Sequence, residues 1–194
     1  MIKALSISIL ILFCITNLNA QNIGATKITL PLSLSKFIPK GYTLLDTARG
    51  NVNGDQYRDV ILVLKIPGED TALDATEYKR PLLILLGNGK GSFSLAARND
   101  NIVYCVKCGG MFGDGYAGLT IKNGSFTVNH FGGSNQRWSN DITFKYAPAK
   151  KTWYLYKIVD KGWSVFDLDK VETNIRTKKT FGTVRFEDYT DEIN

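Results

Sequence analysis

The segment Val60-Ile61-Leu62-Val63-Leu64-Lys65-Ile66 decides the fold of this chain, because it is apolar on both faces of an extended strand. Such a strand lies in the middle of a sheet and is covered on both sides. A second buried run, Leu82-Leu83-Ile84-Leu85-Leu86, follows after the polar residues 67–80, for which we expect a loop with one helical turn. These two runs predict the central strands of a sheet.

Later strands alternate between apolar and polar residues. Residues 119–122 and 125–131 flank Asn123-Gly124, the dipeptide most typical of a tight hairpin. Residues 141–146 and 152–158 flank a short polar segment and predict another hairpin. The chain is therefore predicted to be mainly β, with antiparallel sheets in a two-sheet or partial propeller-like assembly.

Helical patterns are short. Residues 33–38 and 167–173 each predict one helical turn, with Ser33 and Asp167 as capping residues. The acidic end, residues 187–194, is predicted to fray. We therefore expect one or two short helical turns beside the sheets.

The first twenty residues have the layout of a secretory signal peptide. Lys3 precedes an apolar run over residues 7–15, and Leu18-Asn19-Ala20 provides a cleavage site near Ala20. An alternative is lipid attachment at Cys14. Residues 21–194 are predicted to form a single mainly β domain in the periplasm or outside the cell, with no membrane span because no later apolar stretch is long enough.

The charge of the chain argues against a nucleic-acid partner. The net charge is +6, and removal of Lys3 with the signal peptide lowers it to +5. Lysines and arginines are scattered along the sequence, whereas a nucleic-acid binder gathers them into a stripe. We expect a protein or glycan partner, with only weak attraction to anionic surfaces.

The residues between Gly50 and the first buried strand read Asn51-Val52-Asn53-Gly54-Asp55-Gln56-Tyr57-Arg58-Asp59. Oxygen-bearing side chains at alternate positions, together with one backbone carbonyl, can surround a hard cation such as calcium. The predicted ligands are Asn51, Asn53, Asp55, the carbonyl of Tyr57, and Asp59. Alternatively, Asn51, Asn53 and Asp55 form a turn that their own side-chain hydrogen bonds hold.

This loop resembles the FG-GAP or VCBS-type repeat, in which a calcium loop and a strand precede a second strand ending in Leu-Gly-Asn-Gly-x-Gly-x-Phe. The second half corresponds to Leu85-Leu86-Gly87-Asn88-Gly89-Lys90-Gly91-Ser92-Phe93, so the resemblance covers one repeat, about residues 46–97. It implies a fold element and an exported bacterial protein, not a reaction.

Two positions depart from the pattern of that repeat. Asn51 replaces an aspartate, and Gln56 replaces a glycine that has positive φ. Because only Asp55 and Asp59 bring charge, the expected cofactor is weakly bound calcium, held only at millimolar concentration.

Cys105 and Cys108 are predicted to form a short-loop disulfide, because an exported chain meets oxidising conditions. A redox-active pair, reduced cysteines, and a zinc site remain alternatives, although zinc would need more ligands than the single histidine, His130, supplies.

Aromatic residues and an arginine also gather late in the chain. Arg137 and Trp138 are expected to pack against Phe144, Tyr146 and Trp153 at the rim of the core. The same side chains could line a groove for a sugar or a peptide.

On function, the sequence favours an exported, non-catalytic binding or interaction module, because no nucleophile, base and oxyanion donors converge in it. One alternative is a hydrolase of envelope or extracellular polymers that uses Asp55 and Asp59 near Asp114 and His130. Another is a thiol-disulfide protein, which requires an exposed Cys105.

Overall fold

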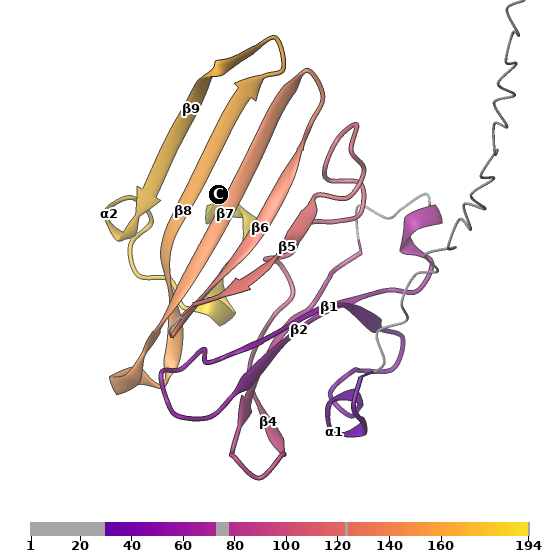
Figure 1. The fold of residues 1–194 in the computed structure, drawn as a ribbon, viewed down its shortest axis with the longest axis vertical. Coiled ribbons are helices and arrows are strands. Elements are labelled where there is room, and N and C mark those ends of the chain that lie inside the picture. The colour runs from indigo at the N-terminus through magenta and orange to yellow at the C-terminus, as the bar shows by residue number, and fades with distance from the viewer. Residues whose placement is uncertain (1–29, 73–77, 123, 194) are drawn as a thin grey trace, which may run out of the picture. The chain divides into compact units, whose positions relative to one another are not determined.

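Two antiparallel sheets make up most of the structure, as the sequence predicts (Figure 1). The computed structural model describes residues 30–72, 78–122 and 124–193. The chain divides into two units, Met1–Leu30 and Pro31–Asn194, and both sheets belong to the second. The predicted signal peptide, Cys14 and Asn123 lie outside the described residues.

The first sheet is a four-stranded meander in the order β1-β2-β3-β4. Its strands are β1 (Thr43–Gly50), β2 (Asp59–Lys65), β3 (Leu82–Gly87) and β4 (Phe93–Asn99). It coincides with the region of the FG-GAP resemblance, and a four-stranded antiparallel sheet is also the form of one propeller blade. The family itself stays a prediction.

The second sheet is a five-stranded meander in the order β5-β6-β7-β8-β9. Its strands are β5 (Tyr116–Ile121), β6 (Ser125–Gly133), β7 (Gln136–Ala147), β8 (Thr152–Ser164) and β9 (Asp167–Thr177). Both predicted hairpins are present: β5 pairs with β6, and β7 pairs with β8.

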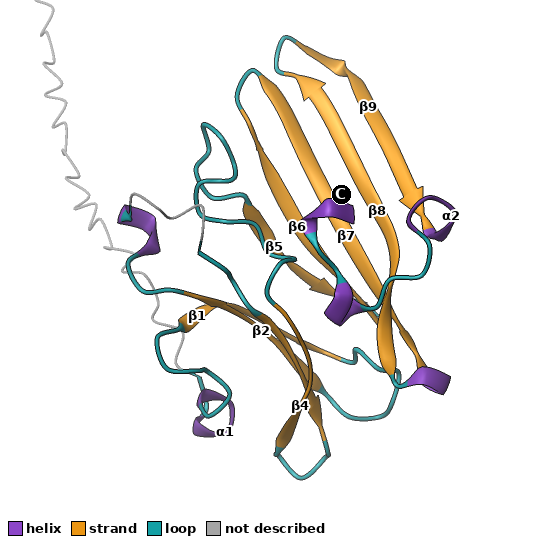
Figure 2. Cartoon of the chain, turned by 180° about the vertical axis from the view of Figure 1, so that it is seen from behind, coloured by secondary structure: helices purple, strands orange, loops and turns teal. Residues whose placement is uncertain are grey.

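The burial of β2 and β3 confirms that they are the central strands of the first sheet. Ile61 and Ile84 point into a core shared with the second sheet, while Leu62 on the opposite face is also fully buried. A short helix, α1 (Leu32–Ser35), lies on the side of the first sheet away from the second (Figures 1 and 2). Apolar residues on both faces of a strand require such cover on both sides.

The C-terminal segment covers one face of the five-stranded sheet, the face seen in Figure 2. Phe186 and Tyr189 are fully buried there, and both rings meet the ring of Phe144. The prediction that residues 187–194 fray is therefore wrong for the described part, because these aromatic side chains bring the acidic segment down onto the core. Asn194 lies outside the described residues.

The predicted helical turns have different outcomes. α1 overlaps the turn predicted at residues 33–38, but its N-cap is Pro31 and not Ser33, and residues 167–173 belong to strand β9. The prediction for residues 167–173 is wrong because cross-strand pairing with β8, from Asp167 to Thr177, overrides the capping pattern. A second short helix, α2 (Lys178–Phe181), was not predicted.

The remaining short elements are single turns of 3-10 helix at Glu69–Thr71, Pro148–Lys150, Phe186–Asp188 and Asp191–Ile193. The first is the turn expected within the loop over residues 67–80, of which 73–77 lie outside the described residues. Over the described ranges, no helix has the length and apolar character needed to cross a membrane.

Candidate functional site

The loop from Asn51 to Asp59 is held by its own side chains. The side-chain oxygen of Asn51 accepts a hydrogen bond from the Gly54 amide at 2.6 Å, and that of Asn53 accepts one from the Asp55 amide at 3.0 Å. Asp55 in turn accepts from the Tyr57 amide at 2.7 Å and from the Asn53 side chain at 2.8 Å. These are the hydrogen bonds of consecutive Asx turns.

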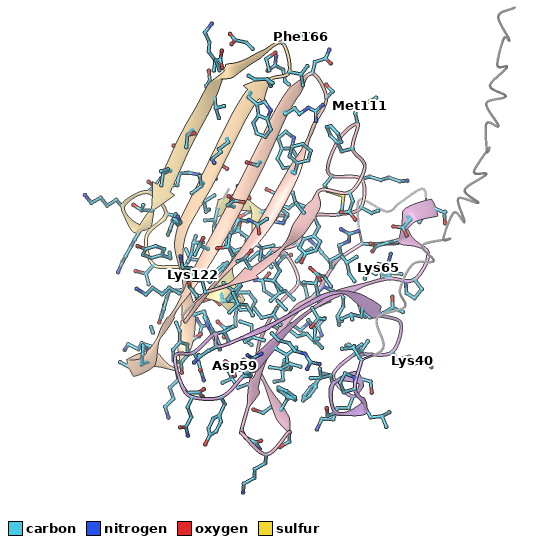
Figure 3. The ribbon with its side chains drawn as sticks, in the orientation of Figure 1. Lys40, Asp59, Lys65, Met111, Lys122 and Phe166 are labelled. Atoms are coloured by element: carbon cyan, nitrogen blue, oxygen red, sulfur yellow. A yellow bond between two sulfur atoms is a disulfide. The ribbon has the colours of Figure 1, made fainter. Side chains whose placement is uncertain are left out.

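Asp59 closes the loop from inside the protein. Its carboxylate is fully buried and accepts hydrogen bonds from the Val52 amide at 2.9 Å and the Gly87 amide at 3.1 Å. Loss of hydration through burial raises the pKa of the Asp59 carboxyl, and the two amides act in the opposite direction. The Asp59 side chain, labelled in Figure 3, thus ties the start of the loop to the end of β3 through these two hydrogen bonds.

The same loop also joins the two sheets. The Val52 carbonyl accepts a hydrogen bond from the Trp153 indole at 2.7 Å, and the Asn51 carbonyl accepts one from the Gly124 amide at 3.1 Å. Trp153 belongs to β8, and Gly124 precedes β6. Val52 is itself fully buried in the core. The loop is therefore a structural joint between the first and second sheets.

Glycines bring the second half of the repeat-like region against this loop. A Cβ atom on Gly87 would lie 2.2 Å from the Arg58 carbonyl oxygen, and one on Gly89 would lie 2.4 Å from the Tyr57 ring. Neither position has room for a side chain. The loop and the Gly87–Gly91 turn are thus built as one packed unit.

The donor set of the loop suits a cation poorly in this arrangement. Asp55 is the exposed carboxylate, whereas both oxygens of Asp59 accept backbone amides. A calcium ion would have to compete with those amides for the second charge. The expected strain at Gln56 is absent, because Gly54 carries the positive φ of the loop, 82°. Calcium binding at Asn51, Asn53, Asp55, Tyr57 and Asp59 stays a prediction.

The predicted disulfide lies in the segment Cys105 to Tyr116, which we call the Cys105 loop and which hydrogen-bonds to Phe131 and Gly133 of β6. Cys105 and Cys108 lie at disulfide distance, with an S–S separation of 2.17 Å, and Cys105 is buried. Nearby, the buried Arg80 guanidinium forms ion pairs with Glu69 and Asp114. This network was not predicted, because its members are far apart along the chain.

His130 is a buried structural side chain of β6. It stacks on Tyr104 with ring centroids 3.9 Å apart, and its Nε2 accepts a hydrogen bond from the Tyr104 amide at 3.4 Å. Burial lowers the pKa of the imidazole to about 4. His130 is therefore neutral at pH 7.

The two sequence motifs lie at opposite ends of β6. The Asn51 loop contacts Gly124 before the strand begins, whereas the Cys105 loop contacts Gly133 at its end. Because a strand rises about 3.3 Å per residue, the distance along β6 from the first contact to His130 is about 20 Å. Asp55 and Asp59 thus do not meet Asp114 and His130 in one site.

Arg137 and Trp138 pack differently from the prediction. The Arg137 guanidinium lies over the Phe112 ring at 4.5 Å, and Trp138 lies beside Tyr104 with centroids 6.0 Å apart. The ring contact expected for Arg137 is present, but with a ring from the Cys105 loop. Trp153, with which Arg137 was expected to pack, lies in the hydrophobic core.

A hollow that no motif predicts opens where β8 loses its partner. β9 pairs with β8 only as far as Lys157, and the chain then turns through α2 and returns to meet Leu155 through the Val184 carbonyl. Between these contacts β8 has a bulge, because neighbouring residues of β7 pair with Lys157 and Leu155 and leave out Tyr156. Bulges re-aim side chains and are frequent beside functional sites.

This hollow, which we call the lysine cleft, has a volume of about 640 Å³. Five lysines line it: Lys145, Lys150, Lys157, Lys178 and Lys179. Three tyrosines, Tyr146, Tyr154 and Tyr156, supply its aromatic surface. Tyr156 is 54% exposed, and the Lys145 ammonium lies 5.6 Å from its ring centroid.

The lysine cleft concentrates positive charge. Among the residues that the structure describes, no aspartate or glutamate lines it, and none forms a salt bridge with its five lysines. These five lysines are far apart in the sequence, because they come from β7, the β7–β8 turn, β8 and α2. In the sequence, only the adjacent lysine pairs Lys150-Lys151 and Lys178-Lys179 indicate this concentration of charge.

Comparison of the chain with protein-family models, with curated protein sequences and with solved structures found no match.

Proposed function

We propose that this chain is an exported, non-catalytic binding module that holds an anionic ligand in the lysine cleft. The observation that carries the proposal is the gathering of five lysines and three tyrosines around one hollow without a carboxylate among its described lining residues. Like charges brought together in this way repel one another unless a ligand of opposite charge compensates them. Tyrosine rings add flat apolar surface on which a ring-shaped ligand can lie.

The fold around the lysine cleft suits binding more than catalysis. Histidine and carboxylates are the usual acids and bases of hydrolytic sites, and the described lining of the cleft brings neither, nor a cysteine; its ionisable groups are lysines and tyrosines. The hydrolase alternative gains no support from Asp59 or Asp114, whose oxygens are held by backbone amides and by Arg80. The thiol-disulfide alternative gains none from Cys105, which is buried.

The proposal is tested by titrating the isotope-labelled mature protein with trigalacturonate and following backbone amide signals by NMR. We expect saturable shifts at residues of the lysine cleft and weaker binding at high salt, because screening shortens the range of charge interactions to a few ångströms. The neutral trisaccharide maltotriose serves as the uncharged control.

Two matched double variants locate the binding. Lys178→Ser/Lys179→Ser removes two cleft charges and should weaken trigalacturonate binding about tenfold, since each exposed ion pair contributes up to about 1 kcal/mol and about 1.4 kcal/mol is a factor of ten. Lys40→Ser/Lys90→Ser removes the same charge at exposed positions near the first sheet and should bind like the wild type. Equal losses in both variants, or shifts spread over all surface lysines, would contradict the proposal.

A further inference from the structure

A second hollow continues the lysine cleft across the open face of the five-stranded sheet, the face turned to the viewer in Figure 1. It has a volume of about 440 Å³ and shares Lys145, Tyr156 and Lys157 with the cleft. Beyond these shared residues it reaches Lys122 and Thr120 at the end of β5. The two hollows therefore form one trough that runs from α2 to β5.

The trough is longer than a single small ligand. Neighbouring strands lie about 4.8 Å apart, so the path from β8 to β5 alone covers about 14 Å. Lysines are placed along this path, with Lys178 and Lys179 at one end and Lys145 and Lys157 in the middle. Lys122, labelled in Figure 3, lies at the other end. This spacing suits a chain with repeated negative charges.

Between the lysines, the second hollow carries small polar groups. Hydroxyls of Ser125, Thr127 and Thr143 line it, together with the Asp141 carboxylate. Asp141 accepts a hydrogen bond from the Asn129 side chain at 2.7 Å, which holds it on the sheet. A carboxylate repels any anionic group placed beside it, phosphate or carboxylate, but accepts hydrogen bonds from sugar hydroxyls. The Thr127 and Thr143 hydroxyls are hydrogen-bonded to each other at 2.9 Å, which leaves one of them free to donate and both able to accept.

We infer that the trough binds an extended acidic polysaccharide, with the carboxylates of the polymer on the lysines and its hydroxyls on Asp141 and the threonines. This inference rests on the proposed function and adds the class and the length of the ligand. Tyr156, exposed at the point shared by both hollows, provides a ring face for one sugar of the chain. The lysines call for an anionic chain, and the mixed polar lining, which offers hydrogen-bond partners to sugar hydroxyls, favours a polysaccharide over a nucleic acid.

The inference is tested with oligogalacturonates of increasing length, from the dimer to the octamer, by isothermal titration calorimetry on the mature protein. We expect the affinity to rise at least tenfold with length and then to level off when the chain fills both hollows. Lys122→Ser, which changes only the second hollow, should weaken the octamer about fivefold and leave the dimer unchanged. Lys90→Ser is the matched control and should change neither.

Each other outcome has a separate meaning. Affinity that is independent of length and insensitive to Lys122→Ser overturns the inference while leaving the proposed anion site in place. Equal or tighter binding of a single-stranded oligonucleotide with the same number of charges, or of vesicles with anionic lipid, overturns the choice of a polysaccharide. If no anionic probe binds, the proposed function itself fails.

Discussion

The Asn51–Asp59 loop and the lysine cleft form an instructive contrast. The loop has the most distinctive sequence pattern in the chain, yet its polar atoms are bonded to one another and to backbone amides. The cleft has almost no sequence pattern, yet its lysines lie unpaired by any described carboxylate around an open hollow. Satisfied polar groups stabilise a fold, whereas unsatisfied charges at a hollow are available to a ligand.

The largest expected effect separates the two aspartates of the loop. Asp59→Ala leaves the buried Val52 amide and the half-buried Gly87 amide without an acceptor and should lower the free energy of unfolding by about 3 kcal/mol. Asp55→Ala removes hydrogen bonds at an exposed site and should cost about 1 kcal/mol. Urea unfolding measures both values, and equal losses would contradict a structural role that depends on Asp59.

The buried His130, on the covered face of the five-stranded sheet, should make the stability of the protein depend on pH. The pKa of His130 is about 4 in the folded protein and about 6.5 in an unfolded chain, so the unfolded chain takes up the proton first as the pH falls. The free energy of unfolding should therefore decrease between pH 6.5 and 4, by roughly 3 kcal/mol from this group.

The matched variant for the pH prediction is His130→Gln. Its stability deficit relative to the wild type should shrink as the pH falls through that window, because it has no imidazole to protonate on unfolding. Asp59 and Asp191, whose carboxyl pKa values are raised by burial, are present in both proteins and leave the difference unaffected. A difference that stays constant with pH would contradict the buried neutral imidazole.

A smaller effect is expected from the cleft lysines on stability. Lys178→Ser/Lys179→Ser changes exposed side chains and should alter the free energy of unfolding by no more than about 0.5 kcal/mol. Thermal unfolding checks this value. A loss of several kcal/mol would mean that the cleft, like the loop, is part of the framework of the fold.

The smallest expected effect is that of calcium. With about 5 mM calcium and a dissociation constant no tighter than that concentration, a site on the folded protein adds no more than about 0.4 kcal/mol. The melting temperature should therefore rise by about 1 °C or less relative to excess chelator. A larger rise that is lost in Asp55→Asn would establish the loop as a calcium site.

Much of the fold could be predicted from local sequence. The double-sided apolar runs identified β2 and β3, and the Asn123-Gly124 dipeptide identified the β5–β6 hairpin, because these features are set by neighbours in the chain. The C-terminal segment could not be predicted in this way. Its acidic residues suggested fraying, whereas Phe186 and Tyr189 are buried against a strand about forty residues earlier.

The candidate site was predictable only in part, because its residues meet through the sheet order. Lys145 and Lys178 are separated by two strands in the sequence but line the same hollow once β8 pairs with both neighbours. The bulge at Tyr156 could not be predicted, because no glycine or other residue typical of a bulge stands at that position. In the loop, by contrast, Asn51, Asn53 and Asp55 and the turn that they hold were identified from the sequence. The bond from the Gly87 amide to Asp59 could not be predicted, because it joins residues of different strands.

Whether the ligand binds at the lysine cleft or at the Asn51–Asp59 loop is decided by a trigalacturonate titration of three proteins: the wild type, Lys178→Ser/Lys179→Ser and Asp55→Asn. Each variant is first shown to be folded by its thermal transition. We predict that the cleft variant loses about tenfold in affinity, while the loop variant binds like the wild type. Loss of binding in the loop variant with full binding in the cleft variant would contradict the account and place the ligand at the loop.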